Sequence, residues 1–117
     1  MSTHLVLDKF SNYQELAKQT ITHKKEGLME LYYATLGLAG EAGEIANKVK
    51  KIIRDDNNVL TDEKRKQIVD ELGDVLWYLS DLCNEMDTTL AQIAQSNIDK
   101  LFDRKERGKL QGSGDNR

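Results

Sequence analysis

The stretch that decides the fold is residues 28–54, LMELYYATLGLAGEAGEIANKVKKIIR. Its apolar residues recur every three or four positions, which places them along one face of an α-helix. They are Leu28, Leu31, Tyr32, Leu38, Ala42, Ile45, Ala46, Val49, Ile52 and Ile53. The chain contains no proline, so no proline interrupts a helix anywhere in it. The pattern predicts one long amphipathic helix over this stretch.

The same rhythm predicts helices on either side. A first helix begins near Asp8, a suitable N-cap, and continues toward Ile21, before a break at Gly27. A third helix follows the polar turn at residues 55–58 and is capped by Thr61.

A fourth helix begins after a cap at Asp87 or Thr88 and stops at Gly108. Four amphipathic helices on short connections predict an all-α fold, a four-helix-type bundle. We expect a single helical domain over residues 1–107 and a glycine-rich tail over residues 108–117. The third helix carries a nearly continuous apolar run, wider than so small a chain can cover, which predicts a homo-oligomer.

Composition narrows the classes of function. The chain has 117 residues, a formal net charge of −3, 38% apolar residues and 32% charged residues. A length of this order fits one domain, and mild acidity disfavours a nucleic-acid partner. We expect no membrane span and no secretory signal, since no long uncharged apolar stretch is present. A single cysteine, Cys83, excludes an internal disulfide and fits a cytoplasmic protein.

Two pairs of acidic residues lie within the expected helices. Glu41 and Glu44 are three residues apart, as are Glu71 and Asp74, so each pair shares a helix face. The pairs lie among apolar residues, where gathered negative charge is costly without a cation. Acidic residues at this spacing also occur on solvated faces without a ligand. Two pairs on neighbouring helices, each beside an interior glycine, favour a metal site.

The ligand chemistry indicates which metal. All four candidate ligands are oxygen donors, whereas the histidines His4 and His23 are distant in sequence. Zinc and ferritin-type di-iron sites require nitrogen or sulfur ligands that this pattern lacks. Oxygen ligands point to Mg²⁺, and Mn²⁺ also fits. Carboxylate-bound Mg²⁺ commonly recruits substrate phosphates, which suggests phosphate chemistry.

Interior glycines and a basic helix face complete the pattern. Gly37, Gly40, Gly43 and Gly73 each cost about 1 kcal/mol relative to alanine, which suggests close approach of a facing helix or a ligand.

Downstream, Asn97, Lys100 and Arg104 can share one face and hold a polyphosphate, although a solvated basic helix end has the same spacing. The tail at residues 108–117 fits either a strap over a phosphate or an irregular terminus.

These residues together resemble a known family. GLAGEAGE at residues 37–44, followed by ELGDVLWYL at residues 71–79, is similar to the MazG-type all-α nucleoside triphosphate pyrophosphohydrolases. The likeness covers roughly residues 28–107. This pair of acidic motifs occurs once in the chain, which resembles the short, single-domain members of the family. Some members carry a lysine four residues before the second acidic pair, where this chain has Gln67.

The resemblance implies a reaction and a set of roles. The reaction is Mg²⁺-dependent cleavage of an NTP or dNTP between the α- and β-phosphates, which gives a monophosphate and pyrophosphate. By position, the metal ligands would be Glu41, Glu44, Glu71 and Asp74, with Glu41 or Glu44 positioning or deprotonating the attacking water. Asn97, Lys100 and Arg104 would contact the substrate. The resemblance also implies a homodimer or homotetramer.

Two alternatives stay open at this point. One is a narrower enzyme of the same superfamily, such as a dCTP or dUTP hydrolase or phosphoribosyl-ATP pyrophosphohydrolase. The other is a helical interaction protein whose acidic clusters hold a metal only structurally. Catalysis requires basic phosphate-binding groups near the metal, and Lys100 and Arg104 supply such groups.

Overall fold

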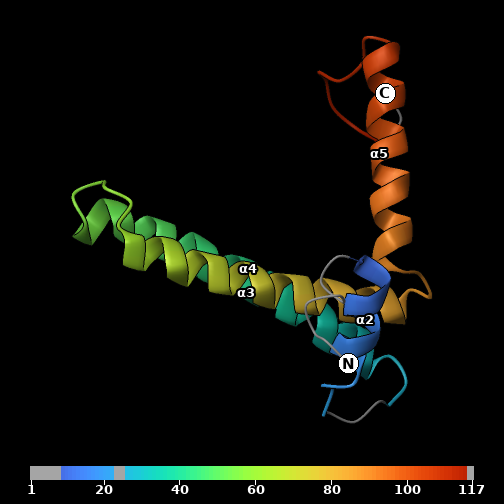
Figure 1. The fold of residues 1–117 in the computed structure, drawn as a ribbon, viewed down its shortest axis with the longest axis horizontal. Coiled ribbons are helices and arrows are strands. Elements are labelled where there is room, and N and C mark those ends of the chain that lie inside the picture. Colours follow the sequence, from blue (N-terminus) through green and yellow to red (C-terminus); the bar gives the residue numbers. More distant parts are fainter. Residues whose placement is uncertain (1–8, 23–25, 116–117) are drawn as a thin grey trace.

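The structure is a computed structural model that describes residues 9–22 and 26–115. Within these ranges the chain is helical and contains no strand, which confirms the all-α prediction. The helices are α2 (Phe10–Lys18), α3 (Met29–Asp55), α4 (Asp62–Glu85) and α5 (Leu90–Glu106). Figure 1 shows α3 and α4 side by side as a long hairpin, with α2 across one end and α5 leading away from that end.

Local chemistry explains most helix ends. The hydroxyl of Thr61 accepts a 3.1 Å hydrogen bond from the Lys64 N–H and so caps α4, as predicted. Asn57 and Asn58 form the preceding turn with positive φ angles of 53° and 62°. Gly108, at φ +69°, follows the end of α5, also as predicted.

Two predicted boundaries need correction, and one lies outside the described residues. The cap of α5 is Thr89, whose hydroxyl accepts from the Gln92 N–H, because Asp87 takes a left-handed conformation (φ +54°) that ends α4. The first predicted helix ends at Lys18, before Ile21. Its predicted cap, Asp8, is not among the described residues.

Gln14 joins three helices at the corner of the molecule. Its side chain donates to Oδ1 of Asn84 (2.8 Å) and to the carbonyl oxygen of Thr88 (3.2 Å), and it accepts from the Leu90 N–H (2.8 Å). The residue is 5% exposed, so water cannot readily replace these bonds. Gln14 therefore sets the direction in which α5 leaves the hairpin.

One chain does not close into the predicted bundle. Helix α5 contacts α2 and α4 but not α3. The radius of gyration is 17.3 Å, whereas a compact domain of this length has about 13 Å. Among the described residues, the buried apolar side chains are Ala17, Ala34, Cys83 and Leu90. The apolar faces are wider than the helices of a single chain can cover.

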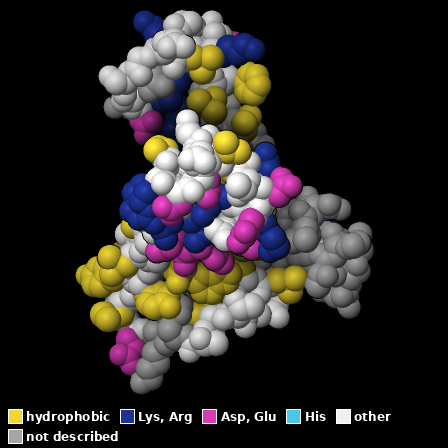
Figure 2. All heavy atoms as spheres, turned by 90° about the vertical axis from the view of Figure 1, so that its left-hand side faces the viewer, with side chains coloured by type: hydrophobic (Ala, Val, Ile, Leu, Met, Phe, Trp, Pro, Cys, Tyr) yellow, Lys and Arg dark blue, Asp and Glu magenta, His cyan; other side chains and the backbone are white. Residues whose placement is uncertain are grey.

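Large apolar side chains are consequently exposed along α3, α4 and α5. They include Met29, Tyr32, Tyr33, Leu36, Val49, Ile53, Val69, Leu72, Ile98 and Phe102. Figure 2, which views the molecule from the turn end of the hairpin, shows hydrophobic surface beside a dense group of acidic and basic side chains. In the described ranges, no helix has an apolar stretch long enough to cross a bilayer.

Candidate metal centre

Three of the four predicted metal ligands meet between α3 and α4. Glu41 comes from α3, and Glu71 and Asp74 come from α4. One carboxylate oxygen from each lies within 4.8 Å of the others. The fourth predicted ligand, Glu44, lies one turn further along α3, outside this group of three, but its charge still acts on Glu41.

The crowding of negative charge changes the protonation of Glu41. A hydrogen bond with Glu71, partial burial and the charges of Glu71, Asp74 and Glu44 raise the pKa of Glu41 from 4.5 to about 7. The carboxylates therefore cannot all be ionised cheaply near neutral pH without a positive charge.

Part of that positive charge comes from Lys48. Its Nζ lies 3.6 Å from Oε1 of Glu71, and both side chains are largely shielded from solvent. The other oxygen of Glu71, Oε2, is buried and has no hydrogen-bond partner. A buried carboxylate oxygen without a donor, beside two further carboxylates, suits a divalent cation with oxygen ligands. The donor set therefore fits Mg²⁺ or Mn²⁺.

Lys48 is a functional residue that sequence analysis missed. The available signal was its position seven residues after Glu41, which places both residues on one face of α3. The position four residues before Glu71 is Gln67, which faces Glu63 at 3.5 Å, and the neighbouring Lys66 pairs with exposed Asp70.

The interior glycines divide into two kinds. A Cβ at Gly37 would collide with the ring of Tyr78 on α4, so this glycine permits the close approach of the two helices, as expected. Gly40, Gly43 and Gly73 have no atom within 4 Å of such a Cβ. In a single chain these three glycines border open space beside the carboxylates.

The predicted substrate contacts lie on α5, away from the carboxylates. Asn97 and Lys100 line a groove of about 450 Å³ together with Thr88, Gln92, Ile93 and Ser96. Lys100 and Arg104 converge on Asp115, each at 3.3 Å from its Oδ1. Helix α5 does not contact α3, and it leads away from the end of the α3–α4 hairpin (Figure 1), so these basic residues lie apart from the three carboxylates within one chain.

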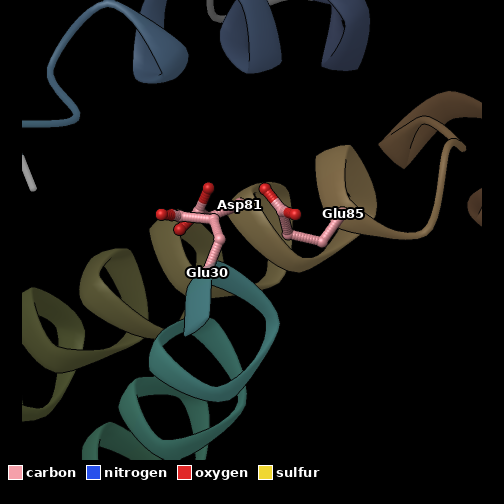
Figure 3. Close-up of side chains that lie close together, drawn as sticks. All are labelled: Glu30, Asp81 and Glu85. Carbon is pink, nitrogen blue, oxygen red and sulfur yellow. The ribbon is translucent and has the colours of Figure 1, made fainter. Parts of the chain in front are cut away.

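Sequence analysis missed a second acidic cluster, which lies between the start of α3 and the end of α4. Glu30 of α3 faces Asp81 and Glu85 of α4 (Figure 3), with oxygens within 4.8 Å of one another. Glu30 and Asp81 are 1% and 2% exposed. The available signal was the four-residue spacing of Asp81 and Glu85, together with the seven-residue spacing of Asp74 and Asp81.

Comparison with known proteins identifies the family. The family model of the MazG nucleotide pyrophosphohydrolase domain matches residues 32–108, which contain the three-carboxylate group and the whole of α5. The chain belongs to the MazG family. A MazG domain is all-α, in agreement with the helices described above.

This MazG protein also has a curated relative from a bacteriophage. It is 50% identical over 109 residues to the Gene 37 protein of Mycobacterium phage L5, and the match covers 90% of this chain and 96% of the relative. No solved structure matches the chain significantly. The family model covers most of this chain, and membership of the family indicates a nucleotide pyrophosphohydrolase.

Proposed function

We propose that this chain is a Mg²⁺-dependent nucleoside triphosphate pyrophosphohydrolase. It would cleave an NTP or dNTP between the α- and β-phosphates and release NMP or dNMP and pyrophosphate. The observation that carries this proposal is the convergence of Glu41, Glu71 and Asp74 between two helices of a MazG domain.

The residues present fit the metal. Glu41, Glu71 and Asp74 would hold Mg²⁺, with Glu44 completing the set, and Mn²⁺ suits the same oxygen donors. When bound, the metal supplies charge neutralisation of the phosphate oxygens and lowers the pKa of a bound water. Lys48 keeps Glu71 in place by its ion pair.

The carboxylates also supply a base. Besides completing the set of metal ligands, Glu44 would orient a water or accept its proton. The water oxygen would form a bond to the α-phosphorus while the bond to the bridging α–β oxygen breaks, and the electron pair leaves with pyrophosphate. Lys100 and Arg104 would stabilise the leaving group, and Asn97 would lie beside them.

The site also requires more than one chain. Lys100 and Arg104 lie away from the carboxylates, and large apolar side chains are exposed on α3, α4 and α5. We therefore place the enzyme in a homodimer or homotetramer, in which a second copy covers these faces and can bring an α5 to the metal centre. The cytoplasm, where the thiol of Cys83 stays reduced, is the expected compartment.

Product analysis tests the proposal. The purified protein is incubated with a panel of NTPs and dNTPs, with and without Mg²⁺, and the products are separated by ion-exchange chromatography. Monophosphate and pyrophosphate should appear in equal amounts and only with metal. The ranking of substrates also reveals a narrower preference, such as for dCTP or dUTP. Release of orthophosphate alone would contradict the proposed bond cleavage.

A matched pair of variants separates catalysis from a structural metal site. Glu44→Gln should lower kcat by at least about a hundredfold without changing the melting temperature greatly, because it removes the base and a ligand. Asp70→Asn is the control, since Asp70 is exposed and pairs with Lys66 outside the cluster. A Glu44→Gln protein with normal turnover and a shifted melting temperature would instead indicate a metal that only stabilises the helices.

A further inference from the structure

The C-terminal segment 108–115, hereafter the tail, meets the two basic residues assigned above to phosphate binding. Figure 1 shows this loop beside the far end of α5. Oδ1 of Asp115 lies 3.3 Å from Nζ of Lys100 and 3.3 Å from Nη2 of Arg104. The carbonyl oxygen of Asp115 accepts a further 2.7 Å hydrogen bond from the same Nη2. One residue of the tail therefore supplies the anion that two cations share.

The path of the tail depends on glycine. Gly112 and Gly114 have φ angles of +125° and +84°, in the region that other residues adopt only with strain. These two conformations return the chain toward α5 and bring Asp115 over the basic pair. The tail is thus built to place a carboxylate there.

Burial is unequal across this contact. The side chain of Arg104 is 4% exposed, whereas that of Asp115 is 83% exposed. A buried guanidinium is costly without an acceptor, but an exposed carboxylate returns to water with little loss. Arg104 therefore requires an anion at this position, and Asp115 is an anion that can be exchanged.

Phosphate offers the same recognition chemistry as this carboxylate. Its oxygens accept charge-assisted hydrogen bonds from a guanidinium and an ammonium, and they carry more negative charge. We infer that Asp115 is an internal competitor for phosphate, which occupies the anion site of Lys100 and Arg104 until the phosphate chain of a nucleotide displaces it. The inference rests on the proposed function for the identity of the ligand, but the anion site can be tested without turnover.

The carboxylate of Asp115 is ionised near neutral pH. Hydrogen bonds from Lys100 and Arg104, and their positive charges, hold the pKa of Asp115 below its usual value. The carboxylate is therefore ionised throughout the neutral range, so the charge that Asp115 places on Lys100 and Arg104 does not change between pH 6 and pH 8.

Binding of inorganic pyrophosphate, measured by isothermal titration calorimetry without divalent metal, tests the inference. Asp115→Asn should bind pyrophosphate about two- to fivefold more tightly than the wild type, the range expected when an exposed carboxylate loses its ion pairs. Asp103→Asn is the matched control, because it also removes one negative charge near the C-terminal end of the chain. Asp103 pairs with Arg107 and not with Lys100 or Arg104, so the affinity of this variant for pyrophosphate should equal that of the wild type.

A second variant disturbs the tail without removing the charge. Gly114→Ala strains the backbone at φ +84°, while its added Cβ meets no atom within 4 Å. It should therefore loosen the tail and also tighten pyrophosphate binding. Unchanged or weaker binding by Asp115→Asn would overturn the inference, as would absence of pyrophosphate binding in every variant. Failure of the wild type to hydrolyse any nucleotide would refute the proposed function and leave this binding comparison valid.

Discussion

The affinity of the metal centre for Mg²⁺ should depend steeply on pH, because Glu41 must lose its proton to act as a ligand. In the metal-free protein the pKa of Glu41 is about 7. About one molecule in ten has an ionised Glu41 at pH 6, and about nine in ten at pH 8. If only the ionised form binds the metal, the apparent Kd for Mg²⁺ should fall about tenfold between these two pH values.

The folding stability of the metal-free protein should fall as the pH rises, whereas the affinity for Mg²⁺ should rise. The folded protein holds the Glu41 proton more tightly than the unfolded chain, whose pKa is near 4.5. The stabilising contribution of this residue is therefore complete below about pH 4.5 and is lost as the pH rises through about 7. Saturating Mg²⁺ should raise the melting temperature more at pH 8 than at pH 6.

Calorimetry with Mg²⁺, without nucleotide, measures both the affinity and the proton release. Titrations in two buffers of different ionisation enthalpy should show about 0.9 proton released per site at pH 6 and about 0.1 at pH 8. Glu41→Gln should bind Mg²⁺ more weakly at every pH, with little pH dependence. A wild-type Kd that is equal at the two pH values would refute the assignment of Glu41 as a titrating ligand.

Two further predictions concern packing. Gly37→Ala should destabilise the protein by about 1–3 kcal/mol in urea denaturation, because the new methyl group meets the Tyr78 ring, whereas Gly40→Ala, beside open space, should not destabilise it. Equal effects of the two substitutions would contradict this distinction. Gln14→Ala should cost about 2–3 kcal/mol, since it leaves a buried N–H at the start of α5 without an acceptor, and exposed Gln95→Ala should be nearly neutral.

The sequence predicted local features well. Apolar spacing located α3 and α4 to within a residue or two, and Thr61 and Gly108 mark helix ends where capping rules place them. Helical periodicity places each acidic pair on one face, and the carboxylates of Glu41, Glu71 and Asp74 do lie together, whereas Glu44 lies outside that group; their role as metal ligands stays a prediction. These features depend on residues near one another in the chain.

Features that depend on tertiary arrangement could not be predicted in this way. The direction of α5 follows from the bonds of Gln14 to residues 70 or more positions away, which no periodicity encodes. The ion pair of Lys48 with Glu71 and the facing of Glu30 and Asp81 likewise depend on the register of α3 against α4. Only the folded hairpin reveals them.

Hydrolysis in water enriched in ¹⁸O tests the central claim most directly. The best substrate of the panel is turned over with Mg²⁺, and both products are analysed by mass spectrometry. Attack on the α-phosphorus predicts one ¹⁸O atom in the monophosphate and none in pyrophosphate. Label in pyrophosphate, or in orthophosphate with a nucleoside diphosphate as the other product, would contradict the account.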